Sequence, residues 1–199
     1  MLYSRFYSSI AMTITGTSSP ASGGEHLISH FLDMLAIRDN RSHDLHGRQV
    51  GVASILMAAL YERVMRVETP EFHQLPEKID TEFWGTLSPV VQREYGKKME
   101  KFPMAVSYLT TQRNWLKLKK SITSSLNSPA KLKTCLQKAG GAHRFSDLQD
   151  SGQPLAREKF VRTVLCANQM RERFTILDLA FLFGILPGSL EEIIDRWVA

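Results

Sequence analysis

The chain has 199 residues, which is enough for one domain, or two small ones, with a substantial hydrophobic core. Hydrophobic residues make up 43% and charged residues 23%, close to globular averages, so disordered and fibrous classes are excluded. The two cysteines, Cys135 and Cys166, form no disulfide framework or metal-binding pair, and we expect buried thiols in a reducing cytosol. The longest apolar run, residues 50–60, is about half of a membrane span, and no signal peptide is recognisable at residue 1. A cytoplasmic protein without a membrane span is therefore predicted.

The formal net charge of +5 is unevenly distributed along the chain. Residues 97–144 contain eleven lysines and arginines and a single acidic residue, Glu100. A block this basic suits a phosphate, a nucleic acid or an acidic partner, but it is also typical of a solvated helical face. No nucleic-acid-binding motif accompanies it, and we expect no nucleic-acid partner.

The first clear helix is expected to begin near residue 22. Ser22 and Glu25 have the spacing of a capping box, in which each side chain bonds a backbone amide of the first turn. Apolar residues follow at helical spacing and predict a helix to about Ile37. After a polar loop, a second helix should start near His46. It is apolar around much of its circumference, which is typical of a buried central helix.

Later helices are indicated by start and stop signals. Helix starts are indicated by Ser88-Pro89, by Ser128-Pro129, and by the caps Thr175 with Asp178 and Ser189 with Glu192, and a helix stop by Gly140-Gly141. Between these signals, a long basic helix over 103–122 and a helix over 155–171 are expected. The one strand-like stretch, residues 12–15, is too short and isolated to build a sheet. The predicted fold is an all-α helical bundle.

Four of the six histidines, His26, His30, His43 and His46, fall within 21 residues. His26 and His30 are four residues apart and share one face of the first helix, and His46 stands at the start of the next. If the loop folds the two helices antiparallel, imidazoles from both could supply half of a Zn²⁺ or Fe²⁺ site. The alternative is a set of polar loop histidines bonded to the backbone.

The segment over residues 16–24 is rich in glycine, serine and threonine and runs directly into the first helix. Exposed amides at a helix start can receive an anion, and the helix dipole favours it. However, the segment is no dinucleotide fingerprint, and by itself it also fits a plain loop.

Three segments, in order and at the expected separation, resemble the glycerol-1-phosphate dehydrogenases, relatives of iron-containing alcohol dehydrogenase, glycerol dehydrogenase and dehydroquinate synthase. They are AMTITG followed by SSPASGGEHLISH over residues 11–30, LHGRQVGV over residues 45–52, and MRERFTILDLA over residues 170–180. The resemblance covers the chain from about residue 10. It implies an all-helical metal-binding domain over residues 10–199, like the C-terminal domain of the dehydroquinate synthase-like fold, after an atypical segment over residues 1–9.

The resemblance also implies which residues bind the metal and which residue transfers a proton. His26 and His46 map onto the two metal-ligand histidines, Glu25 lies beside the first, and His30 is the candidate catalytic residue that passes a proton. The implied cofactors are one divalent metal, Zn²⁺ with Ni²⁺ or Fe²⁺ as alternatives, and NAD(P). The implied reaction is reversible reduction of dihydroxyacetone phosphate to sn-glycerol 1-phosphate, with the 97–144 block as a candidate for holding the phosphate.

Two departures from the family pattern are visible. The family's N-terminal nucleotide-binding domain, which would bind NAD(P), and an aspartate ligand before the first histidine are not recognisable, and Ser19 stands where the family has arginine. These departures lead us to expect that the chain alone is inactive and that it pairs with a separate N-terminal half or forms a homo-oligomer. The alternative is a non-catalytic helical binding or scaffold module derived from the same family.

Overall fold

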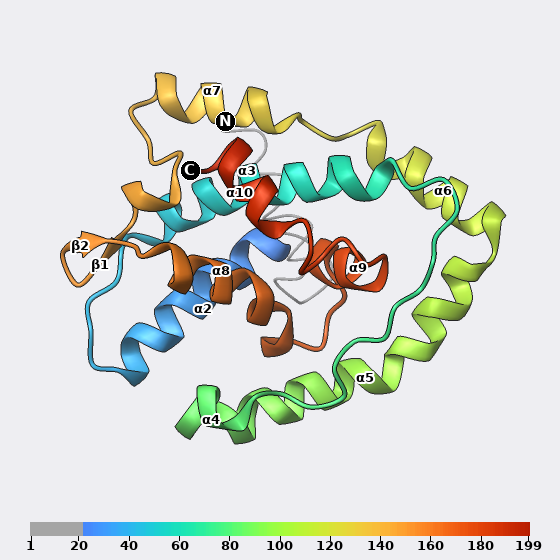
Figure 1. Ribbon diagram of the computed structural model, residues 1–199, viewed down its shortest axis with the longest axis horizontal. Helices are drawn as coiled ribbons and strands as arrows, with labels where there is room; N and C mark the ends of the chain where they lie inside the picture. Colours follow the sequence, from blue (N-terminus) through green and yellow to red (C-terminus); the bar gives the residue numbers. More distant parts are fainter. Residues whose placement is uncertain (1–21) are drawn as a thin grey trace, which may run out of the picture.

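The computed structural model describes residues 22–199 and shows an all-α helical domain (Figure 1). The α-helices are α2 (Gly24–Arg38), α3 (His46–Met65), α4 (Thr81–Trp84), α5 (Ser88–Thr110), α6 (Gln112–Thr123), α7 (Pro129–Lys138), α8 (Arg157–Cys166), α9 (Ile176–Leu182) and α10 (Leu190–Trp197). Short 3-10 turns cover η2 (Gly85–Leu87), η3 (Phe145–Asp147) and η4 (Ala167–Met170). The prediction of an all-α fold is confirmed. The expectations for residues 1–21, including the segment over 1–9, the 12–15 stretch and Ser19, lie outside the described residues.

Among the described residues, the β-structure is a minimal antiparallel pair, β1 (Gln149–Asp150) and β2 (Gln153–Pro154). An isolated bridge joins Asp150 to His43 and so ties this pair to the loop between α2 and α3. No helix in the described part of the chain is long and apolar enough to cross a membrane.

Helices α2 and α3 form the centre of the domain, and α8 and α10 pack against them (Figure 1). The apolar face of α2 is buried through Leu27, Ile28 and Phe31, and α3 contributes Ile55 and Leu56, all fully inaccessible to solvent. These are the positions that the helical apolar spacing predicts. Burying one face of α2 leaves its other face, with the histidines, at the surface.

A second feature is the rim formed by α5 and α6, which curves around one side of the core in Figure 1. The prediction of one continuous helix over 103–122 is wrong. Pro103 lies inside α5, and the chain turns at Thr111, whose φ of −78° and ψ of 111° are extended. The Thr111 carbonyl accepts hydrogen bonds from Asn114 and Trp115 and starts α6. Two consecutive β-branched threonines at this point weaken helix continuation.

Other boundaries differ from the sequence-based expectation in small ways. The cap of α2 is Gly23, whose amide donates to the Glu25 carboxylate at 2.9 Å, so the side chain of Ser22 takes no part in the expected capping box. Past Cys166 the helix expected to reach residue 171 tightens into a 3-10 turn. Cys135 is exposed and Cys166 is half-buried, so the expectation of two buried thiols is wrong.

The rim is attached to the core by a buried ion pair. Lys98 of α5 and Asp178 of α9 are both fully buried, and the ammonium donates to the carboxylate at 2.8 Å and also to the Asn168 carbonyl. Asp178 also accepts from the amide and hydroxyl of Thr175 at the start of α9, as its cap spacing predicts. Burial holds the pKa of Lys98 below its usual value. The pair is thus a polar link that fixes α5 against α9.

Candidate metal centre

Three histidines meet on the outer side of the α2–α3 contact. His26 and His30 project from α2, and His46 is the first residue of α3. The ring centroids of His26 and His46 are 5.3 Å apart, those of His30 and His46 are 5.4 Å apart, and those of His26 and His30 are 6.4 Å apart. The structure therefore brings together three of the four histidines that the sequence singles out.

The loop between the two helices holds His46 in place through Asp44, which is buried. The Asp44 carboxylate accepts from the amides of Leu45, at 2.7 Å, and Gln149, at 2.9 Å. The Arg48 guanidinium, one turn into α3, donates to the same carboxylate at 3.0 Å. Because these contacts fix the first turn of α3 against the β1 region, they also fix the position of the His46 ring.

Polar neighbours indicate which ring nitrogen carries the proton in His26 and in His46. Nδ1 of His26 lies 2.9 Å from Oε1 of Glu25, and a carboxylate can only accept, so Nδ1 carries the proton. Nδ1 of His46 lies 2.7 Å from the Ser29 hydroxyl, which itself donates to the buried Gln49 amide oxygen at 2.5 Å. That hydroxyl has one hydrogen, so it accepts from His46. In both rings the lone pair is therefore on Nε2, which is available to bind a metal.

His30 is the third ring of the cluster and is half-buried. Burial, the neighbouring His46 and the Arg171 guanidinium hold the pKa of His30 below its ordinary value, although Asp33 acts in the opposite direction. The ring is therefore neutral at neutral pH. A neutral imidazole can take up a proton or bind a cation.

A carboxylate joins the histidines from the next turn of α2. One donor atom each from His30, Asp33 and His46 lie within 4.8 Å of one another. Oδ2 of Asp33 lies 3.9 Å from Nδ1 of His46, and Oδ1 lies 3.0 Å from Nδ1 of His43. The sequence motifs do not indicate Asp33 as a site residue, although it follows His30 by three residues and so shares its helix face.

The arrangement fits a divalent cation. Two imidazoles bound to one Zn²⁺ at about 2.1 Å have ring centroids roughly 5 Å apart. The separations of 5.3 and 5.4 Å around His46 agree with this, whereas the His26–His30 separation of 6.4 Å is longer. Oδ1 of Asp33 is buried and has no hydrogen-bond donor among the described residues. The donor set of imidazoles and a carboxylate is one that Zn²⁺, Ni²⁺ and Fe²⁺ accept.

The cations that lie beside the cluster come from the segment before α9. Arg171 acts electrostatically on His30, and Arg173 donates to the Ser22 hydroxyl at 3.0 Å beside the start of α2. Nε of Arg173 is buried without a hydrogen-bond partner in the described part of the chain. Within the 97–144 block, Lys98 forms an ion pair with Asp178, and Lys101 forms one with Glu172.

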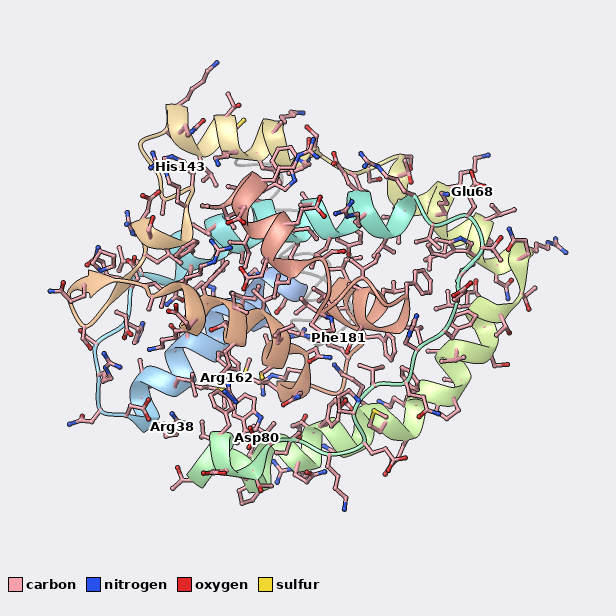
Figure 2. The ribbon with its side chains drawn as sticks, viewed as in Figure 1. Arg38, Glu68, Asp80, His143, Arg162 and Phe181 are labelled. Carbon is pink, nitrogen blue, oxygen red and sulfur yellow. The ribbon has the colours of Figure 1, made fainter. Side chains whose placement is uncertain are left out.

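The remaining two histidines lie in other surroundings. The ring of His73 packs on Gly184, and its backbone amide donates to the Leu182 carbonyl. His143 follows α7, where Figure 2 labels it, and its ring contacts the Gly141 carbonyl and the Asp147 carboxylate. Both serve as matched controls for the cluster.

Comparison with known proteins gives one consistent group of relatives. A glycerol-1-phosphate dehydrogenase [NAD(P)+] from Halalkalibacterium halodurans is 32% identical over 172 residues, which are 85% of this chain and 34% of that protein. The enzyme of the same name from Bacillus licheniformis is 25% identical over 191 residues, or 96% of this chain and 36% of that protein. One from Haloquadratum walsbyi is 57% identical over 54 residues. No family model matches the chain. The chain spans about a third of the length of the curated relatives it matches, and the resemblance indicated by its motifs is confirmed.

Proposed function

Because the chain resembles part of the glycerol-1-phosphate dehydrogenases, we propose that its histidine cluster is the metal centre of a reaction that interconverts dihydroxyacetone phosphate and sn-glycerol 1-phosphate with NAD(P). The observation that carries this proposal is the pair of contacts at Nδ1: Glu25 and Ser29 occupy Nδ1 of His26 and His46, so that within residues 22–199 Nε2 of both rings is left for a cation. Polar partners behind the ligand histidines are the usual arrangement in protein metal sites.

His26 and His46 would hold the cation, Zn²⁺ with Ni²⁺ or Fe²⁺ as alternatives. A divalent cation bound there supplies Lewis-acid chemistry toward a carbonyl oxygen. The two histidines come from different helices, so their relative position depends on the α2–α3 packing and on the Asp44 contacts. Helices and a buried carboxylate hold the ligands rigidly, as catalysis requires.

His30 is positioned to handle the proton that the reaction consumes or releases. When hydride reaches a ketone carbon, the former carbonyl oxygen needs a proton, and oxidation of the alcohol releases one. The His30 ring is neutral at neutral pH because its pKa is lowered, so it can accept a proton from the alcohol and return it. The ring centroids of His30 and His46 are 5.4 Å apart, so His30 would lie close to an oxygen bound to a cation that His46 holds.

Arg171 and Arg173 are proposed to hold the substrate phosphate. Arg171 is the basic side chain whose charge acts on His30, and Arg173 contacts Ser22 at the first turn of α2. Guanidinium groups bind phosphate through paired N–H donors, and a helix N-terminus favours negative charge. These features favour the arginine pair, rather than the 97–144 block, as the proposed phosphate-binding group.

Calorimetric titration of the zinc-loaded protein with sn-glycerol 1-phosphate tests this function. We expect binding to the unchanged protein, no measurable binding after His46→Ala, and at least a tenfold loss after Arg171→Gln, because a charged bidentate contact is removed. Arg113→Gln removes an exposed arginine of α6 as a matched control and should leave binding within twofold. Failure of the unchanged protein to bind, or equal losses from Arg113→Gln and Arg171→Gln, would contradict the proposal.

Glu25→Gln tests the orientation of the His26 ring. The carboxylate accepts from both Nδ1 of His26 and the Gly23 amide, and an amide side chain supplies no charge to the ring. Loss of such a partner weakens metal binding about 10–100-fold in characterised sites. Zinc affinity measured by competition with a chromophoric chelator should fall by that factor. Glu82→Gln, an exposed position in α4, should leave the affinity unchanged.

A further inference from the structure

Asp33 has one carboxylate oxygen beside the cluster that receives no hydrogen bond from the described residues. Its Oδ1 atom is buried, and the nearest donor, Nδ1 of His43 at 3.0 Å, directs its one hydrogen to the Asp44 carbonyl at 2.9 Å. The described contacts therefore leave this oxygen without a donor. A buried carboxylate oxygen in this state is destabilised unless a cation or a water satisfies it.

We propose that His30, Asp33 and His46 form a second position for a divalent cation, beside the His26–His46 position and sharing His46 with it. The three donor atoms already lie within 4.8 Å of one another, and small side-chain rotations would reach the roughly 3.4 Å separation of donors around Zn²⁺. The set supplies two neutral nitrogens and one negative oxygen, so it also offsets part of the cation's charge. The inference rests on the proposed function only through His46.

The second position has a consequence for the role of His30. A ring that binds a cation through its lone pair cannot accept a proton there. A cation at the second position therefore removes His30 from proton transfer, and a cation at the His26–His46 position leaves it available. The two positions thus correspond to two states of one site, distinguished by whether Asp33 is a ligand.

Titration with Co²⁺, followed by its visible absorption, separates the positions because the spectrum reports the ligands directly. We expect Asp33→Asn to lower Co²⁺ affinity at least tenfold and to change the spectrum, and His30→Ala to do the same. Asparagine keeps an acceptor oxygen for its neighbours, so a loss reports the missing negative ligand rather than a missing hydrogen-bond acceptor. Asp39→Asn, just past the end of α2 and paired with Arg38, should stay within twofold.

The outcomes distinguish the two proposals. If Asp33→Asn and His30→Ala both match the unchanged protein while His26→Ala abolishes binding, the second position is refuted and the proposed function stands. If Asp33→Asn and His30→Ala weaken binding and His26→Ala does not, the second position stands and the ligand role of His26 falls. If His46→Ala leaves Co²⁺ binding unchanged, both proposals fall. Circular dichroism identifies a misfolded Asp33→Asn protein, and His30→Ala then decides the test.

Discussion

Lys98→Met is expected to lower the free energy of unfolding by about 3–5 kcal/mol, because it leaves the Asp178 carboxylate buried without its counter-charge. Methionine keeps most of the volume of the lysine stem, so the loss reports the ion pair rather than a cavity. Both side chains are fully buried, and Asp178 also caps α9. Urea unfolding followed by circular dichroism measures the change.

Lys97→Met is the matched control for this prediction. Lys97 is the neighbouring residue of α5, but its ammonium is exposed and meets Glu94 at 3.2 Å at the surface. Exposed pairs of this kind contribute about 0–1 kcal/mol. A double change, Lys98→Met with Asp178→Asn, should recover part of the loss because no unpaired charge is left. Equal stability of the Lys98→Met and Lys97→Met proteins would show that the pair does not fix α5 to the core.

His46→Ala is expected to abolish Zn²⁺ binding, because both proposed positions use this ring. Removing it leaves at most His26 alone at one position and His30 with Asp33 at the other. Ser29 already contacts Nδ1 of this ring and Asp44 holds the start of its helix, so little conformational entropy is lost when the ring binds a cation. Isothermal titration calorimetry with Zn²⁺ measures the loss. His26→Ala should also remove binding at the first position.

His73→Ala and His143→Ala are the controls for the histidine series. Neither ring belongs to the cluster of His26, His30 and His46, and each has its own packing or backbone contact. Both proteins should bind Zn²⁺ as the unchanged chain does. A comparable loss from all four substitutions would indicate nonspecific binding to exposed imidazoles.

Much of the helical framework could be predicted from local signals. The starts at His46 and after Ser128, and the cap of Thr175 with Asp178, follow from side-chain chemistry within one turn, and the structure has all three. The break at Thr111 has only a weak local signal, the two consecutive threonines, which many helices tolerate. The surrounding sequence keeps a helical pattern, and the turn at this point is made where Trp115 packs into the core.

The candidate site shows the same contrast between features that have a local sequence signal and features that depend on distant contacts. The approach of His26 to His46 was expected from the family motifs. The loop joins the far end of α2 to His46, whereas His26 lies at the start of α2, so their close approach depends on how α2 and α3 pack. Contacts between distant parts of the chain carried no local signal: the link from Lys98 to Asp178 spans 80 residues, and Arg173 reaches Ser22 across 151. Asp33 did have a signal, its helical spacing from His30, but an acidic residue on a helix surface is common.

Anomalous diffraction from crystals of the zinc-loaded protein, recorded at the zinc absorption edge, tests the metal centre most directly. The account predicts strong anomalous density at the α2–α3 contact, about 2.0–2.1 Å from His46, with His26 as the other histidine ligand at the first position and with His30 and Asp33 as the other ligands at the second. A peak that is not bonded to His46, or no peak at this contact in crystals that contain zinc elsewhere, would contradict it.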